Sequence, residues 1–511
     1  MTGPTMREAP RMSARSWIAL FACSTLIQPG VTLAATDPEL DSAFLSVAGE
    51  ALESEFRATA GTRGRFFRDA VYVAEAFPVL AYTASAERGT LQVAVETRAT
   101  AQLGVQTRDG RSGQAEVTLQ PRVSVKLPSG VKITALALAK VDAFDEIERG
   151  DVISRELSRT SRPARIGDRT TLELRELYLE GRVGKSEVKI GRQQTPWGNA
   201  MGLKVLDVVN PVDFSEFILP EFDDSRIPLY SVNVETPIGE STLRTVWVLD
   251  QTYAELAPRG STFEFTTPLL IPRMPTGLPF PIVVDSIDRP GRLVRDSDVG
   301  FEFATALGGV DVSLNYLYHY DDIPIPFVTP PDGPGQPLLV DLEYRRTHLI
   351  GGTASKFVGP LRLRTEFGYS TDKYLTNENP NDRDKVSKFA DFSYVFGFDF
   401  FGLPQTIMSF QFFQNVISRD ANDEFLERDR TETNMTFFLR RTFLDERLEF
   451  RTIVLHSLNR ADGILRPRLT YTASDDMNVY FGADVFYGTK GGFFGQFKER
   501  DRVVLGLEWQ R

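Results

Sequence analysis

The chain has almost no cysteine. Cys23 is the only thiol among 511 residues, and it lies in a segment that we expect to be removed during secretion. The mature protein would then contain no thiol, which excludes disulfides, thiolate metal sites and a cysteine nucleophile. Histidine is also scarce, with three residues. No HExxH or GxSxG motif accompanies the histidines, and no glycine-rich phosphate loop is present. We therefore expect no cofactor and no metal.

Beyond its first 35 residues the sequence also lacks an apolar run near the ~20 residues that a membrane-spanning helix needs. Basic residues are outnumbered, 58 against 69 acidic ones, which gives a formal net charge of -11. A nucleic acid is therefore not an expected partner. The chain is instead rich in Pro (30), Gly (39) and Phe (37), a composition typical of strands and turns.

The N-terminus has the three parts of a secretory signal. Arg7, Arg11 and Arg15 precede an apolar run at 17–27, and small residues follow up to Ala35. This pattern predicts a signal peptide over 1–35, cleaved near Ala35. Residues 20–23 loosely imitate a lipoprotein box, but the apolar run before them is short, so lipidation is the weaker alternative. Residues 36–89 show no clean period, and we expect a periplasmic or plug-like segment there.

From residue 90 onward, apolar and polar residues alternate. Val310, Val312 and Leu314, for example, alternate with Asp311 and Ser313. Segments of about ten residues with this period, separated by turns, are typical of a transmembrane antiparallel β-barrel. A large soluble β-sandwich or propeller would alternate as well.

The alternation predicts about eighteen strands over residues 90–511, with about eight tight turns and about nine long loops. The even number and the short periplasmic turns opposite long outer loops favour the barrel, as do aromatic residues near both strand ends. A barrel of this size encloses an aqueous lumen. The expected strands are 90–107, 116–127, 131–144, 171–183, 187–194, 229–237, 242–252, 298–307, 310–320, 345–357, 361–370, 389–401, 405–418, 434–443, 448–456, 465–472, 478–487 and 502–509.

The stretch 190–228 differs from its surroundings. Pro196, Pro211, Pro220 and Pro228 exclude a continuous strand or long helix, yet the stretch is rich in Leu, Val, Ile and Phe. We expect this third outer loop to fold into the lumen and narrow it; alternatively, it caps the mouth. Its candidate constriction or binding residues are Trp197, Lys204, Asp207, Asp213, Glu216, Glu221, Asp223, Asp224 and Arg226, and the expected lumen wall comprises Glu176, Tyr178, Glu180, Arg182, Arg362, Arg364 and Glu366. Strand parity leaves the direction of Arg192 open.

Two further loops, 253–297 and 321–344, combine many prolines with apolar residues. Exposed apolar patches often mark binding surfaces, so these loops are candidates to collect an apolar or amphipathic molecule. The alternative is that they pack on each other as a lid. His319 and His348 are predicted on the lumen faces of different strands. A hydrolytic Ser-His pair would need partners that meet only in space, and we do not expect an enzyme.

Several blocks resemble a known family. GRQQTPWG at 191–198, GLKVLDVVNP at 202–211, EFDDSRIPLYSV at 221–232 and the closing hairpin at 481–509 are similar to recurring blocks of a proteobacterial outer-membrane family of unknown function. That family is grouped with porin-like barrels such as alginate exporters and substrate-specific porins. The resemblance implies a barrel in the cell outer membrane. The chain departs from such barrels in ending on Gln510 and Arg511 after Trp509.

The sequence thus predicts a porin-like channel whose cargo is an amphipathic or apolar small molecule or lipid. The expected partners of the barrel are the surrounding outer-membrane lipid and a periplasmic transport protein. A hydrophilic solute porin is the first alternative. An outer-membrane enzyme acting on lipids is the second, and a structural or adhesion barrel is the third.

Overall fold

The computed structural model describes residues 92–511, with gaps at 109–111, 145–157, 159–160, 168, 272–280, 332, 334 and 420–422. The predicted signal peptide (1–35) and the segment 36–89 lie outside these residues. Among the described residues, helix is confined to short pieces: α4 (Phe222–Ser225), η1 (Asp423–Phe425) and η2 (Gly495–Phe497). No helix in this part of the chain is long and apolar enough to cross a membrane.

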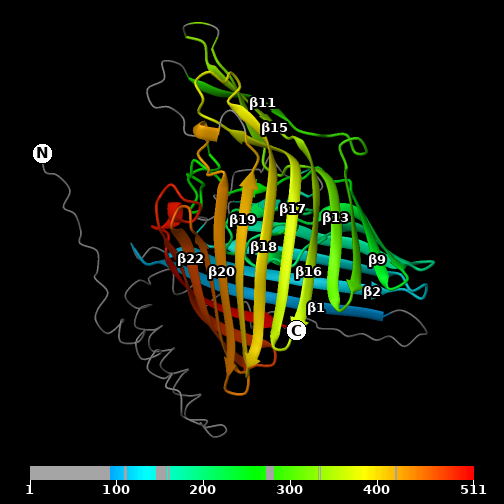
Figure 1. The fold of residues 1–511 in the computed structure, drawn as a ribbon. Coiled ribbons are helices and arrows are strands. Elements are labelled where there is room, and N and C mark those ends of the chain that lie inside the picture. Colours follow the sequence, from blue (N-terminus) through cyan, green and yellow to red (C-terminus); the bar gives the residue numbers. More distant parts are fainter. Residues whose placement is uncertain are drawn as a thin grey trace, which may run out of the picture. The chain divides into compact units, whose positions relative to one another are not determined.

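One antiparallel sheet of 19 strands dominates the fold (Figure 1). The short β4 pairs only with β5, and the other eighteen form a ring because β1 pairs with both β2 and β24. The eighteen are β1 (Gln92–Gln106), β2 (Ser112–Lys126), β3 (Lys132–Asp142), β5 (Thr170–Val183), β6 (Ser186–Gln193), β8 (Leu229–Ile238), β9 (Ser241–Val248), β12 (Asp298–Leu307), β13 (Val310–Tyr320), β16 (Arg346–Val358), β17 (Leu361–Thr376), β18 (Val386–Leu403), β19 (Thr406–Ile417), β20 (Thr431–Phe443), β21 (Leu448–Ser457), β22 (Asp462–Ser474), β23 (Met477–Tyr487) and β24 (Arg502–Gln510). The predicted eighteen-stranded barrel is confirmed.

The residues after Trp509 take part in closing the ring. Gln510 is opposite Arg98 in the β1–β24 ladder, and Arg511 exchanges backbone hydrogen bonds of 2.8 and 3.0 Å with Thr97. The unusual chain end is therefore an extension of the last strand.

Tight turns join the strands at one rim. Gly308 and Gly309, for example, connect β12 to β13 with φ of 59° and 75°, the left-handed pair that a two-residue hairpin needs and that glycine adopts without strain. The opposite rim carries the longer connections. Two of these, 107–111 between β1 and β2 and 458–461 between β21 and β22, are short, so the prediction of nine long loops was wrong at these two places.

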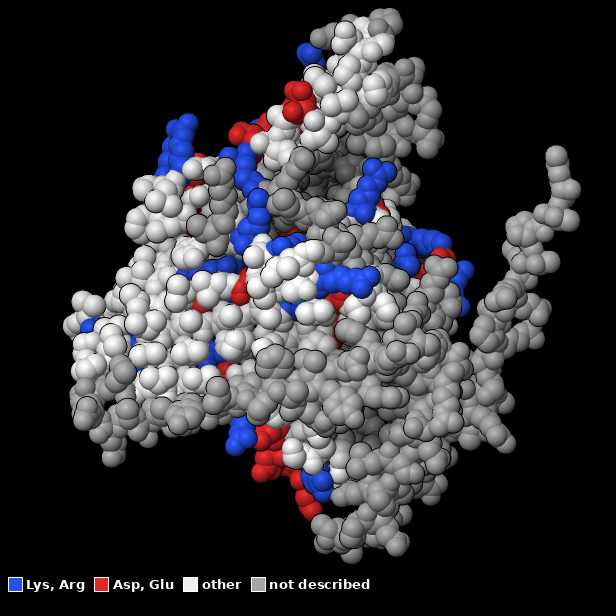
Figure 2. All heavy atoms as spheres, turned by 180° about the vertical axis from the view of Figure 1, so that it is seen from behind, with Lys and Arg blue, Asp and Glu red and all other residues white. Residues whose placement is uncertain are grey.

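The outer face of the barrel is apolar. On β5, Leu172, Leu174, Leu177 and Leu179 are 40–48% exposed, as expected for side chains that face lipid. In Figure 2, uncharged side chains cover a continuous area on the left of the view, and charged side chains are visible toward the top, across the middle and at the lower edge. Polar residues alternate inward, so the barrel has an apolar outside and a polar lumen.

A short extra strand and Arg192 complete the wall above β6. β4 (Ala164–Ile166) pairs with the upper part of β5, beyond the residues that pair with β6. The buried Arg192 guanidinium lies at this change of partner and donates to the carbonyls of Leu174, Pro228 and Ser161 and to Glu173. The sequence left the direction of the Arg192 side chain open. In the structure this side chain lies within the wall and donates to backbone carbonyls that have no strand partner there.

The two proline-rich loops pair with each other. β11 (Ile282–Asp288) runs parallel to β15 (Leu338–Glu343), which also pairs with β14 (Ile325–Thr329). This three-stranded sheet lies beyond the loop ends of the barrel strands (Figure 1). The two loops therefore form one structure, as the lid alternative expected. Apolar side chains remain outside it, since Val283 and Val284 are 42% and 54% exposed.

The apolar outer belt predicts a strong dependence on depth in the membrane. Leu314 in the middle of β13 and Leu307 at the turn end of β12 are both 62% exposed. We expect Leu314→Arg to lower the free energy of unfolding from lipid vesicles by about 2–4 kcal/mol, and Leu307→Arg by about 0–1 kcal/mol. Denaturant titration of both variants in vesicles measures this difference. Equal losses would contradict a bilayer around this belt.

Candidate functional site

The connection between β6 and β8, residues 194–228, contains β7 (Asp213–Phe214) and α4; we call it the inner loop. It hydrogen-bonds to Glu366 on β17 and to Gln114 on β2. β17 is nine strands away from β2 in the ring of eighteen, by way of β3, β5, β6, β8, β9, β12, β13 and β16. The inner loop therefore contacts inward side chains on opposite sides of the barrel.

Glu366 holds the first part of the inner loop. Its carboxylate accepts the backbone N–H groups of Asn199, Ala200 (3.1 Å) and Leu206 (2.7 Å), and only 1% of the residue is exposed. Hydrogen bonds to an ionised group contribute about 1.5–3 kcal/mol each. Gly198 has φ of +77°, and a Cβ there would lie 2.5 Å from the carboxylate, so this approach requires glycine.

Two other wall side chains bind the same piece of backbone. The Gln411 amide accepts from Met201 N–H at 3.0 Å and donates to Met201 C=O at 3.1 Å, which reproduces the pairing of a strand. Arg364 donates to the carbonyl of Asn199 and to Asp399. An acid, an amide and a guanidinium thus satisfy backbone groups that would otherwise be buried without partners.

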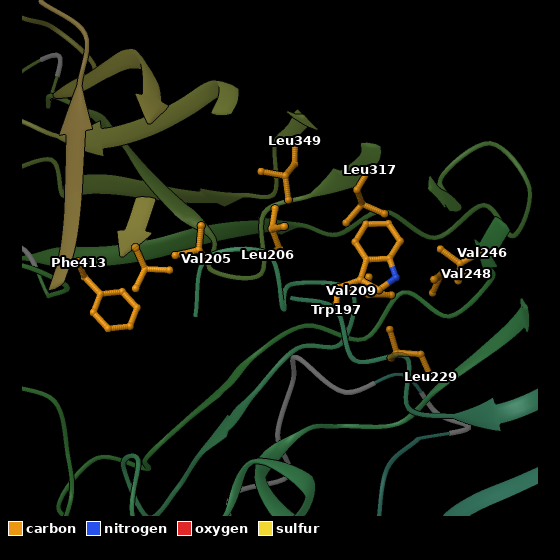
Figure 3. Close-up of a cluster of buried hydrophobic side chains, with 11 residues drawn as sticks. Trp197, Val205, Leu206, Val209, Leu229, Val246, Val248, Leu317, Leu349 and Phe413 are labelled. Atoms are coloured by element: carbon orange, nitrogen blue, oxygen red, sulfur yellow. The ribbon is translucent and has the colours of Figure 1, made fainter. Parts of the chain in front are cut away.

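The apolar residues of the inner loop cover an apolar patch of the wall. This inner patch consists of Val246, Val248, Leu317, Leu349, Val395 and Phe413. Figure 3 shows the Trp197 indole against Leu317 and Leu206 against Leu349. Glycines make the contact possible, because a Cβ on Gly300 would lie 2.8 Å from the Trp197 ring, and one on Gly351 would overlap Leu206. Trp197 is therefore an anchor that is only 4% exposed.

The second part of the inner loop packs in a phenylalanine cluster. Phe217 is fully buried, and its ring centre lies 4.7 Å from that of Phe497 and 5.8 Å from that of Phe265. These partners come from the β23–β24 and β9–β12 connections. The cluster comprises Phe217, Leu219, Ala257, Phe263, Phe265, Leu455, Ile464, Phe486, Phe494 and Phe497. Three connections are thus joined over the inner faces of β21, β22 and β23.

Several predicted charges of the inner loop pair with one another. Asp207 accepts from Arg226 at 2.8 Å and lies 3.1 Å from Lys204, and Arg226 also pairs with the exposed Asp223. Burial lowers the pKa of Lys204, although Asp207 opposes this shift. Burial alone would also lower the pKa of Arg226, but its hydrogen bonds to Asp207 raise it. These groups brace the loop more than they line an opening.

Three other loop acids reach the wall. Glu216 lies 3.5 Å from Lys140, Glu221 lies 2.8 Å from Arg451, and Asp224 lies 2.5 Å from Arg98. Asp213 instead caps the turn that follows it, accepting from Ser215 N–H at 2.8 Å. The inner loop is therefore tied by ion pairs to β1, β3 and β21.

The predicted wall residues divide into two groups. Arg364 and Glu366 bind the inner loop, as described above. Glu176, Glu180 and Arg182 pair within the wall, with Arg122 at 3.5 Å, Lys132 at 3.1 Å and Glu187 at 3.1 Å. Tyr178 lies under Lys189 at 3.7 Å. Arg362 completes the predicted set, and its Nε is buried without a hydrogen-bond partner in the described part of the protein.

The prediction for His348 was wrong. His348 is opposite Tyr318 in the β13–β16 ladder and stacks on it at 4.6 Å; it also hydrogen-bonds to Tyr316 at 2.8 Å. This is the outer face, on which Ile350 is 49% exposed. His319 has the opposite parity and is 6% exposed, so the two histidines share no site. Among the described residues, no group of His, Cys, Asp and Glu could hold a metal ion.

Sequence reasoning missed several residues that hold the inner loop. Arg175 donates to the carbonyls of Asp223 and Arg226 at 3.2 and 2.8 Å, and Arg466 donates to that of Leu219 at 2.6 Å. Gln411 was missed as well. Inward parity marks Gln411 and Arg466 as wall residues, but no sequence signal tells which carbonyl a wall side chain will meet.

The family of the chain follows from a match over residues 52–391 to the model described as "Protein of unknown function (DUF1302)". The chain belongs to this family. No curated protein matches it. The family assignment agrees with the resemblance carried by the 191–198 and 202–211 blocks, and it leaves the transported molecule open.

Solved porins are similar in structure. Acinetobacter baumannii OccAB3 matches with 9% identity, 82% of this chain and 99% of that chain covered, and a TM-score of 0.45. Pseudomonas aeruginosa OpdK with vanillate matches with 11% identity, 83% and 98% coverage, and a TM-score of 0.45. Salmonella typhi OmpF in complex with daunomycin matches with 11% identity, 83% and 98% coverage, and a TM-score of 0.38.

The geometry around Glu366 predicts how firmly the inner loop is held. In Glu366→Gln the side chain keeps its size but presents an NH₂ donor to backbone donors. We expect the amides of Asn199, Ala200 and Leu206 to exchange with deuterium about tenfold faster or more, because a charge-assisted hydrogen bond is lost. Hydrogen exchange with mass spectrometry measures this change.

The matched control is Glu302→Gln, which removes an inward carboxylate that pairs with Arg244 at 3.0 Å and leaves the inner loop untouched. Unchanged exchange of the three amides in Glu366→Gln would show that the carboxylate does not hold the loop.

Proposed function

We propose that this protein is a porin-like channel of the cell outer membrane whose lumen is narrowed by the inner loop. The supporting observation is that one connection contacts inward side chains on both β2 and β17, which are opposite in the ring. A segment that crosses a pore of this size divides its cross-section, so the charges and apolar side chains of the loop select what passes.

The cargo that fits best is an amphipathic or apolar small molecule or lipid. Exposed apolar side chains on the outer connections support this choice, among them Val284, Leu293 and Val294 at 54%, 62% and 66% exposure. Such surfaces attract the apolar part of a solute before it enters the lumen. A periplasmic partner would then receive the cargo.

A hydrophilic solute porin is the second candidate, favoured by the polar inner wall. The two candidates differ in the current they carry. A hydrophilic porin conducts steadily and ohmically as purified, whereas a conduit for apolar cargo with the inner loop in place conducts little and co-purifies with lipid. Single-channel recording of the refolded chain in a planar bilayer, together with lipid analysis, separates them.

Removal of part of the inner loop tests the constriction. Deletion of residues 201–221 removes most of the inner loop, including its Leu206 contact with Glu366 and its Glu221 contact with Arg451. We expect the single-channel conductance to rise several-fold because the lumen widens. A deletion of 379–384 in the β17–β18 connection shortens another loop at the same rim and should leave conductance as it was. If the first deletion leaves conductance unchanged, the inner loop does not constrict the lumen.

A further inference from the structure

Four arginines gather on the inner wall below the phenylalanine cluster. Arg440, Arg451 and Arg468 are opposite one another across β20, β21 and β22. Arg466 lies two residues before Arg468 and therefore on the same face. We call Arg451, Arg466 and Arg468 the arginine site. Arg451 lies on the same inward face of β21 as Leu455, and Arg466 and Arg468 lie on the same inward face of β22 as Ile464. Leu455 and Ile464 both belong to the phenylalanine cluster.

The acids around these arginines do not balance them. Arg440 pairs with Glu449 at 2.6 Å and Arg466 with Asp484 at 2.8 Å. Arg468 faces the ring of Tyr480 at 4.6 Å, and no carboxylate of the described residues lies within ion-pair distance of it. Arg451 pairs with Glu221 of the inner loop. Without Glu221, two guanidiniums would lack a counter-charge.

Glu221 is an acid brought to this site by the loop. Its side chain is 60% exposed and that of Arg451 is 34% exposed, so the pair is accessible from water. Burial would raise the pKa of Glu221, but Arg451, Arg466 and Arg468 outweigh burial and hold this pKa below its ordinary value. Exposed ion pairs contribute little free energy. Another carboxylate can therefore exchange with Glu221 at small cost.

Apolar surface adjoins the arginine site directly. Ile453 and Leu455 follow Arg451 on the same face of β21, and both pack in or against the phenylalanine cluster. Phe217, four residues before Glu221 along the inner loop, is buried in that cluster. Leu455 is only 3% exposed, so the partly buried Ile453 is the apolar contact open to a ligand whose carboxylate meets the arginines.

We propose that the arginine site binds the carboxylate of an amphipathic solute, which replaces Glu221 on Arg451 while its apolar body lies against Ile453. This proposal rests on the channel function proposed above and specifies its cargo class. Arginine recognises a carboxylate through paired, charge-assisted hydrogen bonds. Binding releases the Glu221 end of the inner loop, so the solute itself displaces one of the attachments that hold the loop.

The test is calorimetric binding of 4-phenylbutanoate, and of its uncharged amide, to the folded protein in non-ionic detergent at low salt. We expect the carboxylate to bind and the amide to bind at least tenfold more weakly. Arg468→Gln and Arg451→Gln should weaken carboxylate binding about tenfold, since each loses a charge-assisted contact. Glu221→Gln should strengthen it several-fold, because the competing carboxylate is gone.

Glu187→Gln is the control, since it removes an exposed acid paired with Arg182 far from the site in the β5–β6 ladder, and it should bind as the wild type does. Heat-modifiable migration identifies folded barrels, and Arg468→Gln and Glu221→Gln alone decide the matter if Arg451→Gln does not fold. Equal binding of carboxylate and amide, or unchanged affinity in both of those variants, overturns the proposal.

The binding measurement and the conductance measurement fail separately. A rise in conductance on deletion of 201–221 without carboxylate binding would overturn the arginine site and leave the channel in place. Carboxylate binding with unchanged conductance after that deletion would overturn the constriction instead.

Discussion

Backbone hydrogen bonding constrains this protein twice. In the wall, the bilayer offers no partners, and in the closed ring of eighteen strands each strand pairs with a neighbour on both sides. Inside the wall, the first part of the inner loop has no strand partner, and wall side chains supply its backbone hydrogen bonds. Glu366 accepts three N–H groups, and Gln411 both donates to and accepts from Met201. The position of the loop thus depends on a buried carboxylate.

The apolar content of the inner loop follows from the hydrophobic effect. Exposing Trp197 and Leu206 to water is unfavourable, but these residues leave water when they pack on the inner patch. The wall is shaped for them, with Gly300 and Gly351 at the contact points. The inner patch is apolar, although the rest of the lumen wall is polar, because the inner loop covers it.

The sequence predicted the barrel well because strand periodicity is local. Each of the eighteen expected segments overlaps an observed strand, from 90–107 for β1 to 502–509 for β24. Features that depend on register were harder. His348 was placed on the wrong face because the parity of β16 is decided by its pairing with β13. The pairing of β11 with β15 joins two loops distant in sequence, and no local pattern encodes it. The same holds for Asp207, whose partner Arg226 is found only once the loop has folded.

The contacts that hold the inner loop differ in their exposure to water, and this exposure decides which contact opens first. The first half is held by Glu366, which is 1% exposed, and by Leu206, which is fully buried; burial removes the competition of water, so this attachment is strong. The wall contact of Glu221 in the second half is an ion pair open to solvent, which water and salt weaken. An anion in the lumen competes with the second attachment and not with the first. The Glu221–Arg451 contact should therefore open first, while Trp197 stays docked on the inner patch and Phe217 stays buried in the phenylalanine cluster.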